Sequence, residues 1–208
     1  IIECNPLYHM KKTLIAANWK SNKTKNEARN WIFEVSHEEF PNNLEVIIFP
    51  PFTLFDFLDS FIKANNLPFK MGAQDLSPFE SGAYTGEISA LQIKEFADYV
   101  LIGHSERRTN FSESLELVKK KTERAIAQGL IPIVCISDIK QTEGLDQNEI
   151  IFAYEPIGSI GTGNPEDPSS VDKIGERIKG GSDRKVIYGG SVNFSNIKNY
   201  TSQENISG

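Results

Sequence analysis

Two polar residues stand just after short apolar runs, where a buried strand would end, and their types are those of acid–base chemistry. Glu155 directly follows the run from Ile150 to Tyr154. A carboxylate there is costly unless it is paired or opens into a cavity, so Glu155 is a candidate general base. His104 follows the run from Tyr99 to Ile102. If a helix begins at this point, its free amides would favour a neutral imidazole, which suits a catalytic role. The alternative without function is a polar start of a helix that carries a surface ion pair.

A cation and an amide follow the first apolar run. This run ends at Asn18, and Lys20 stands two residues further on. Because side chains alternate along a strand, Asn18 and Lys20 share an orientation, and both could face the same opening. A solvated loop charge is the plainer interpretation of Lys20.

Two glycine-rich segments could hold an anion. The segment from Pro156 to Asn164 contains Gly158, Gly161 and Gly163, and it suits either a turn or a hinged lid whose amides close on an anion. It does not have the glycine order of a dinucleotide-binding loop, so an NAD site is not expected. After the last apolar run, Gly189 to Ser191 offers amides and a hydroxyl where phosphate commonly docks in barrels.

Short apolar runs alternate with polar, helix-like stretches along the chain. Continuous apolar strands that alternate with helices indicate a parallel sheet buried on both faces. Such a repeat allows an open doubly wound sheet or an eight-stranded barrel that is incomplete, and periodicity alone does not choose between them. The expected strands are Thr13 to Asn18, Glu45 to Phe49, Lys70 to Ala73, Tyr99 to Ile102, Ile131 to Ile136, Ile150 to Tyr154 and Val186 to Tyr188.

Helices are expected between these strands. The clearest one runs from Ser112 to Gln128, with Asn110 and Glu113 in the spacing of a capping box and Gly129 as its stop. The others are expected at Glu27 to Glu39, Leu54 to Asn65, Ala90 to Ala97, Ser169 to Lys179 and Ser195 to Tyr200.

Two parts of the repeat are short. The 13 residues at 137–149 leave room for at most a short helix between the fifth and sixth strands. We therefore expect Ile133 and Ile151 to belong to an exposed apolar patch on the outer faces of these strands. About seven strands are expected, with an eighth only beyond Gly208, so that the first and seventh strands keep unpaired edges.

Composition and net charge indicate which kind of protein this is and which partners are not expected. The chain has 208 residues, a formal net charge of −6 and 39% hydrophobic residues, which is typical of one globular domain, placed here at 10–208. Residues 1–9 are unpatterned and are interpreted as a leader that need not be native. The negative charge argues against nucleic acid and anionic membranes as partners. Two cysteines and three histidines have no metal-ligand spacing, so no metal is expected, and a reducing cytoplasm fits.

Five motifs, taken together, resemble the triosephosphate isomerase family. They are AANWKSN at 16–22, GAYTGEIS at 82–89, LIGHSERR at 101–108, AYEPIGSIGTG at 153–163 and YGGSVN at 188–193. They occur in the family's order and at nearly its spacings. The resemblance implies a (β/α)8 TIM barrel, incomplete in this chain. It also implies interconversion of dihydroxyacetone phosphate and glyceraldehyde 3-phosphate through an enediolate, with no metal or organic cofactor.

The resemblance also implies the catalytic roles. Glu155 would move the proton between two carbons, His104 would polarise the carbonyl oxygen, and Lys20 would supply positive charge. Asn18 would assist as a hydrogen-bond donor. The residues implied to support the site are Ser105 and Glu106.

Phosphate would be held by the Gly161 amide and by Ser191, under a lid at 158–162. Thr85, in the loop at 74–88, matches the arm through which the family forms homodimers, so a homodimer is implied. Departures from the family are Gly158 where an aromatic residue is usual and Ser137-Asp138 where Gly-Glu is usual. The alternative function is an inactive or fragmentary barrel homologue that keeps the catalytic residues but does not close the barrel or hold phosphate.

Overall fold

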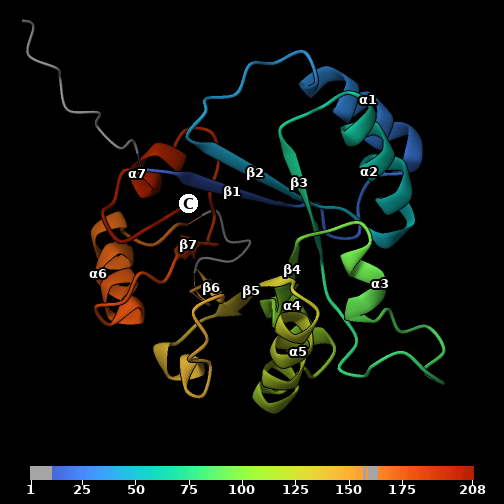
Figure 1. Cartoon of the computed structure of the whole chain (residues 1–208). Coiled ribbons are helices and arrows are strands. Elements are labelled where there is room, and N and C mark those ends of the chain that lie inside the picture. The colour runs from blue at the N-terminus through green and yellow to red at the C-terminus, as the bar shows by residue number, and fades with distance from the viewer. Residues whose placement is uncertain (1–10, 157, 159–163) are drawn as a thin grey trace, which may run out of the picture.

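The computed structural model describes residues 11–156, 158 and 164–208, and in this part of the chain seven parallel strands form one sheet. The sheet curls into a nearly closed barrel with the helices outside it (Figure 1). Its strand order follows the sequence from first to last, whereas a doubly wound sheet reverses its order at a switch point, so the barrel alternative is the correct one. The strands are β1 (Thr13–Asn18), β2 (Leu44–Phe49), β3 (Phe69–Ala73), β4 (Tyr99–Ile102), β5 (Ile131–Ile136), β6 (Ile151–Tyr154) and β7 (Val186–Tyr188).

Each expected helix overlaps a helix of the structure, with ends that differ by a few residues. An additional short helix follows β4, and 3-10 helices occur as well in the part of the chain that the structure describes. The α-helices are α1 (Lys25–Val35), α2 (Phe55–Ala64), α3 (Ala90–Lys94), α4 (Ser105–Asn110), α5 (Leu115–Ala127), α6 (Pro168–Lys179) and α7 (Ile197–Thr201), and the 3-10 helices are η1 (Phe52–Leu54) and η2 (Ile139–Thr142).

The start of α5 differs from the expected capping box. The helix begins at Leu115, and its N-cap is Ser114, whose hydroxyl accepts a hydrogen bond from the Leu117 amide. Glu113 does not cap the helix, because its buried carboxylate lies 3.2 Å from the ammonium of Lys121. The capping pair of Asn110 and Glu113 was therefore wrong.

Apolar side chains form two separate layers, one inside the barrel and one between strands and helices. Ile133 and Ile151 belong to the inner layer and are 0% and 4% exposed. The expectation that they form an exposed outer patch was wrong, because their side chains point to the barrel axis. The inner layer consists of Leu14, Ile47, Phe49, Tyr99, Leu101, Ile133, Cys135, Ile151, Ala153 and Ile187.

The outer faces of β5 and β6 are covered despite the short crossover. The link contains η2, and its Leu145 is buried in the same outer cluster as Ile136 and Phe152. The prediction of at most a short helix in this link is confirmed. One 3-10 turn with one buried leucine takes the place of a longer helix.

The last residues of the sequence pair with both β1 and β7. The Leu14 amide donates to the Ser207 carbonyl over 2.8 Å, the Ser207 amide donates to the Val186 carbonyl over 2.6 Å, and the Tyr188 amide donates to the Gly208 carbonyl over 3.0 Å. The expectations that both edges are unpaired and that eighth-strand pairing begins only beyond Gly208 were therefore wrong at these residues.

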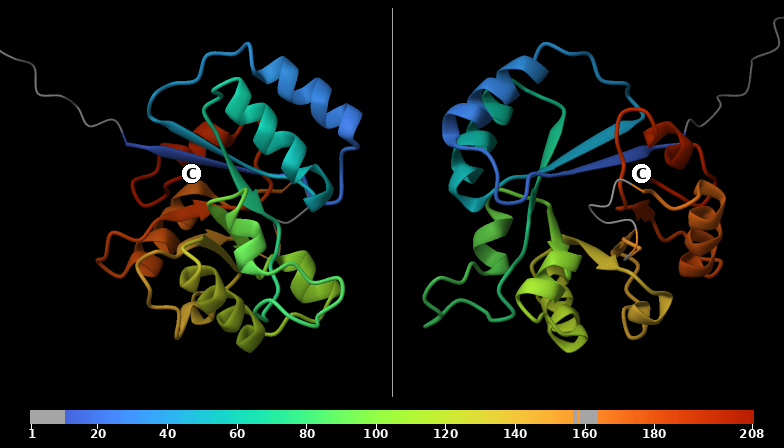
Figure 2. Two further views of the ribbon diagram at one scale, coloured as in Figure 1. Left: turned by 45° about the vertical axis from the view of Figure 1, so that its right-hand side comes forward. Right: turned by 180° about the vertical axis from the view of Figure 1, so that it is seen from behind.

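The loop at 74–88 has no regular secondary structure and projects from the barrel, as Figures 1 and 2 show. Thr85 lies exposed near its tip. None of the helices in the described ranges has the length and apolar character needed to cross a bilayer.

Candidate active site

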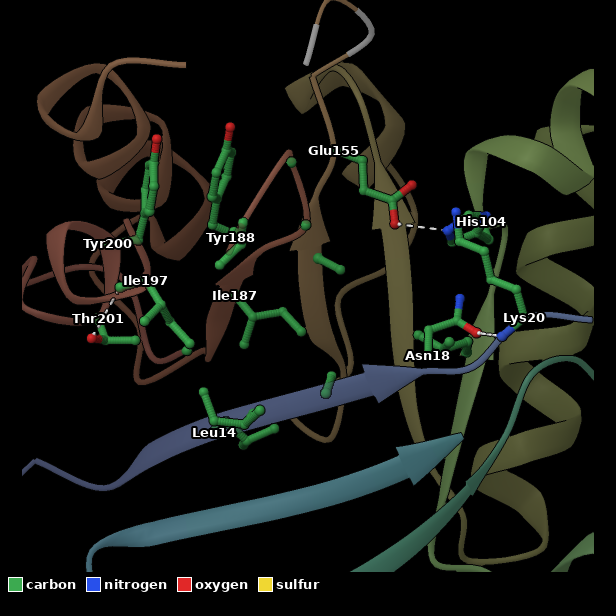
Figure 3. A pocket seen from close by; sticks show the side chains of 18 residues that line it. Leu14, Asn18, Lys20, His104, Glu155, Ile187, Tyr188, Ile197, Tyr200 and Thr201 are labelled. Atoms are coloured by element: carbon green, nitrogen blue, oxygen red, sulfur yellow. Dashed lines mark hydrogen bonds and ion pairs between the residues drawn. The ribbon is translucent and has the colours of Figure 1, made fainter. Parts of the chain in front are cut away.

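A cavity of about 380 Å³ joins the ends of four strands to α7 (Figure 3). One end is polar and is formed by Asn18, Lys20, His104 and Glu155, and the other is mainly apolar. The structure therefore brings together the four residues that the sequence singles out as the main side-chain catalysts. They come from the ends of β1, β4 and β6, because parallel strands of a barrel end at one rim.

The carboxylate of Glu155 is held at the start of α4. Its side chain follows β6 directly and is 7% exposed. Oε2 accepts a hydrogen bond from the Ser105 amide over 3.2 Å, while Oε1 lies 3.6 Å from Nε2 of His104. A free helix amide and an imidazole thus face the two oxygens, which offsets the cost of burying the charge.

Two neighbours of Glu155 were not found from the sequence. A Cβ on Gly189 would lie 2.8 Å from Cγ of Glu155, so only glycine leaves the space that this side chain occupies. Cys135 lies on β5 inside the barrel, where burial raises the pKa of its thiol and the Glu155 carboxylate raises it further. The thiol therefore stays protonated. Both contacts join residues distant in sequence, so no local pattern marks them.

His104 is the N-cap of α4, and this capping bond determines which ring nitrogen carries the proton. Nδ1 accepts a hydrogen bond from the Glu106 amide over 3.2 Å. A nitrogen that accepts carries no proton, so the ring proton is assigned to Nε2. Nε2 points to the side of the cavity where Glu155 lies (Figure 3). The imidazole is thereby oriented as a hydrogen-bond donor to a bound molecule.

Lys20 lies across the cavity mouth and has a left-handed backbone, with a φ of 54°. Its amide donates to Oδ1 of Asn18 over 2.9 Å, and its ammonium lies 2.5 Å from Oε1 of Glu106. Gln74 donates from Nε2 to the Lys20 carbonyl over 2.8 Å and also bonds the Phe49 carbonyl. These contacts hold the strained backbone in place. Gln74 directly follows β3, and this position after a strand is the sequence feature that marks it as a candidate.

The remaining expected site residues are placed as follows. Ser105 contributes its amide, while Oε2 of Glu106 lies 3.6 Å from Nδ1 of His104. Ser191 follows β7, and its carbonyl accepts a hydrogen bond from the Asn196 side chain over 2.9 Å. Its neighbours Gly190 and Val192 line the cavity. Gly161 lies outside the described residues, as does most of the segment at 157–163.

Within the described ranges, no three side chains of His, Cys, Asp or Glu are grouped so that they could hold a metal ion.

The sequence of this chain is similar to those of known proteins. The sequence model of the triosephosphate isomerase family matches residues 13–208. A protein of Mycoplasmopsis pulmonis named triosephosphate isomerase is 39% identical over 227 aligned residues, which cover 96% of this chain and 91% of that protein. Relatives of the same name occur in Dehalococcoides mccartyi, at 37% identity with 96% and 89% covered, and in Trichodesmium erythraeum, at 35% identity with 96% and 92% covered.

Proposed function

Because the chain belongs to the triosephosphate isomerase family, we propose that it interconverts dihydroxyacetone phosphate and glyceraldehyde 3-phosphate. The reaction moves one proton between neighbouring carbons and another between their oxygens, with an enediolate between the two steps. It needs a base for the carbon-bound proton and a donor for the carbonyl oxygen. We assign this reaction to a single domain at 10–208.

The observation that carries this proposal is the pairing of Glu155 with His104 across one cavity. Their facing atoms lie 3.6 Å apart and both residues line the cavity, so one bound substrate can present its carbon-bound proton to Glu155 and its carbonyl oxygen to His104. Glu155 removes the proton from one carbon and returns it to the next. His104, with its proton on Nε2, donates to the oxygen that becomes negative.

Lys20 and Asn18 assist at the same oxygen. The Lys20 ammonium is the cation at the polar end of the cavity, and it stabilises both the enediolate and the phosphate charge. Glu106 holds Lys20 and lies beside His104, so it fixes these two groups relative to one another. The hydrogen bond from the Ser105 amide fixes the position of the Glu155 carboxylate before the substrate binds.

The phosphate belongs near the end of β7. Gly189 and Gly190 line the cavity there, and Ser191 follows them. Backbone amides without side chains in the way let an anion approach closely. We assign the Ser191 and Gly161 amides and the Ser191 hydroxyl to phosphate.

The inactive alternative is not favoured. It supposed a barrel that stays open along β1 and β7, whereas Ser207 and Gly208 pair with both strands. The short crossover does not leave the outer faces of β5 and β6 exposed either, because Leu145 and its neighbours cover them.

We propose a homodimer formed through the loop at 74–88, in the cytoplasm. The loop exposes a stacked pair of rings, Phe79 and Tyr84, with centroids 4.2 Å apart. An exposed aromatic pair on a projecting loop is typical of a protein interface. Sedimentation of the purified chain should give a dimer, and Thr85→Arg should shift it to the monomer. A monomer at all concentrations for the unmodified chain would refute the assembly.

A coupled assay in deuterated water tests the function. The purified chain is given dihydroxyacetone phosphate, and aldehyde formation is followed. A proton carried by one carboxylate exchanges with solvent, so deuterium should appear at carbon 2 of the product. The absence of any turnover above the enzyme-free rate would refute the proposal.

A further inference from the structure

Glu166 is bonded by three tyrosine hydroxyls from three different elements. The Tyr154 hydroxyl donates to Oε2 of Glu166 over 3.1 Å, and the Tyr200 hydroxyl donates to its carbonyl over 2.6 Å. The Glu166 amide in turn donates to the Tyr188 hydroxyl over 2.9 Å. These tyrosines stand at the end of β6, in α7 and at the end of β7, so Glu166 ties three elements together.

The three rings are buried and packed on one another. Tyr154, Tyr188 and Tyr200 are 8%, 6% and 3% exposed. The rings of Tyr188 and Tyr200 are stacked with centroids 4.3 Å apart, and Tyr154 lies 6.5 Å from Tyr188. A buried hydroxyl needs a partner, and here each of the three finds one on Glu166.

The hydrogen bond from Tyr154 to the Glu166 side chain persists over the working pH range. Burial raises the pKa of Tyr154 to about 12, and the nearby Glu166 carboxylate contributes to the rise. The hydroxyl therefore keeps its proton and remains a donor. A hydrogen bond to a charged acceptor is stronger than one between neutral groups.

The three-tyrosine cluster is next in sequence to Glu155 and to Gly189, the glycine against which the Glu155 side chain packs. Tyr154 directly precedes Glu155, and Tyr188 directly precedes Gly189, which leaves the space for the Glu155 side chain. We propose that Glu166 is a positioning residue for Glu155: by bonding Tyr154 and Tyr188 it fixes the ends of β6 and β7, between which the carboxylate lies. This inference rests on the proposed function, in which Glu155 is the base.

A second tyrosine–glutamate pair supplies a matched control. The Tyr99 hydroxyl donates to Glu45, and this pair joins β4 to β2. Neither residue lines the cavity. Tyr99→Phe and Tyr154→Phe therefore remove the same kind of bond, but only the second is next to Glu155. A merely structural role predicts similar effects of the two variants.

The test measures kcat, KM and thermal stability for Tyr154→Phe, Glu166→Ala, their double variant and Tyr99→Phe. It also measures the affinity for 2-phosphoglycolate by calorimetry, because the carboxylate and phosphate of this compound imitate the enediolate without needing turnover. Tyr154→Phe and Glu166→Ala should each lower kcat about tenfold, since small displacements of a catalytic group are costly. KM should change little, the double variant should lose no more than either single one, and Tyr99→Phe should keep kcat. Glu166→Gln keeps an acceptor for Tyr154 and should restore most of the rate.

Equal kcat values for Tyr154→Phe and Tyr99→Phe, or losses that multiply in the double variant, would overturn the positioning role. If Tyr154→Phe does not fold, Glu166→Ala and Glu166→Gln decide alone. If the unmodified chain has no turnover but binds 2-phosphoglycolate, the proposed function fails. The positioning role then stands if Tyr154→Phe, and not Tyr99→Phe, weakens binding about tenfold. Absence of both turnover and binding overturns both proposals.

Discussion

The Ser105 amide donates a hydrogen bond to Oε2 of Glu155 over 3.2 Å, so a residue next to His104 holds the carboxylate that faces His104. The end of β6 and the start of α4 are thereby joined through one side chain. The two groups assigned to acid–base chemistry are oriented by the same turn of helix.

Glu155→Gln should lower kcat by a factor of about 10² to 10⁴, because an amide does not take up a proton from carbon. The glutamine oxygen can still accept the Ser105 amide, so the fold should persist, as circular dichroism and urea unfolding would show. Glu149→Gln, at an exposed site, is the control and should keep the rate. Near-normal turnover by Glu155→Gln would exclude this carboxylate as the base.

Gly189→Ala should lower kcat at least about tenfold while leaving the chain folded. The new Cβ would lie 2.8 Å from Cγ and 3.3 Å from Oε1 of Glu155, so the carboxylate has to move. Gly181→Ala adds the same methyl group where nothing lies within 4 Å and away from the cavity, so it should keep kcat, although its φ of 80° makes the variant less stable. Steady-state kinetics of both variants checks this, and equal rates would contradict the close approach.

Lys20→Met should raise KM for the triose phosphate and lower kcat/KM at least about tenfold, because it removes the cation at the polar end of the cavity. Its stability should change by only about 0–1 kcal/mol, since the ion pair with Glu106 is almost half exposed on both sides. Lys23→Met removes a nearby cation that lies over the Trp19 ring and is the control. An unchanged KM in Lys20→Met would count against the assigned role.

The raised pKa of Asp75 determines whether its contribution to the free energy of unfolding rises or falls with pH. Burial raises the pKa of this carboxyl, and this effect outweighs the opposing charges of Lys121 and Arg107. The folded state thus keeps the Asp75 proton to a higher pH than the unfolded state does. The contribution of Asp75 to the free energy of unfolding is therefore largest below its ordinary pKa of about 4, and it falls as pH rises through the raised value.

Asp75→Asn lacks this titration. The free energy of unfolding of the unmodified chain minus that of the variant should decrease from pH 4 upward, by up to about 1.4 kcal/mol per pH unit. Urea unfolding between pH 4 and pH 7 measures the difference. Parallel curves for the two proteins would contradict the raised pKa.

Ile206→Ala should lower the free energy of unfolding by about 2–5 kcal/mol, because the side chain is fully buried beside the residues that bridge β1 and β7. Leu91→Ala, at a residue 54% exposed, should change it by only about 0.5 kcal/mol. Urea unfolding monitored by circular dichroism gives both values. Similar small losses would mean that the last residues do not close the barrel in solution.

The strands were predictable because each contains a short, mainly apolar run that is followed by a polar residue, a glycine or a proline. The predicted start at Ile150 differs from the observed Ile151 by one residue. A strand that is apolar on both faces has no alternation of polar and apolar residues, so its sequence does not show which side chains face the barrel axis. For this reason Ile133 was assigned to the outer face, although it lies inside the barrel. A helix start was considered at His104, but α4 was not placed as an element of its own, because SERRTN lacks apolar periodicity.

The site was predictable as far as it consists of residues that follow strands, such as Asn18, His104 and Glu155. The groups that hold them were not. The contacts of Cys135 and of Glu166 join residues that are separated in the sequence, so no local pattern predicts them. Gln74 does follow a strand, but this position does not show that its side chain bonds the Lys20 and Phe49 carbonyls. The end of the barrel was misjudged for a similar reason, because the pairing of Ser207 with Leu14 joins opposite ends of the chain.

The short crossover between β5 and β6 has a consequence for the order of folding. Ile133 pairs with Ile151, 18 residues further along, whereas the other neighbouring strands pair residues 23 to 34 positions apart. Closing a shorter loop loses less chain entropy, and local contacts speed folding. The β5–β6 unit is therefore the part of the barrel expected to form first, as a nucleus on which the longer crossovers assemble. The segment that carries Glu155 would then be ordered before β1 and the turn that carries Lys20.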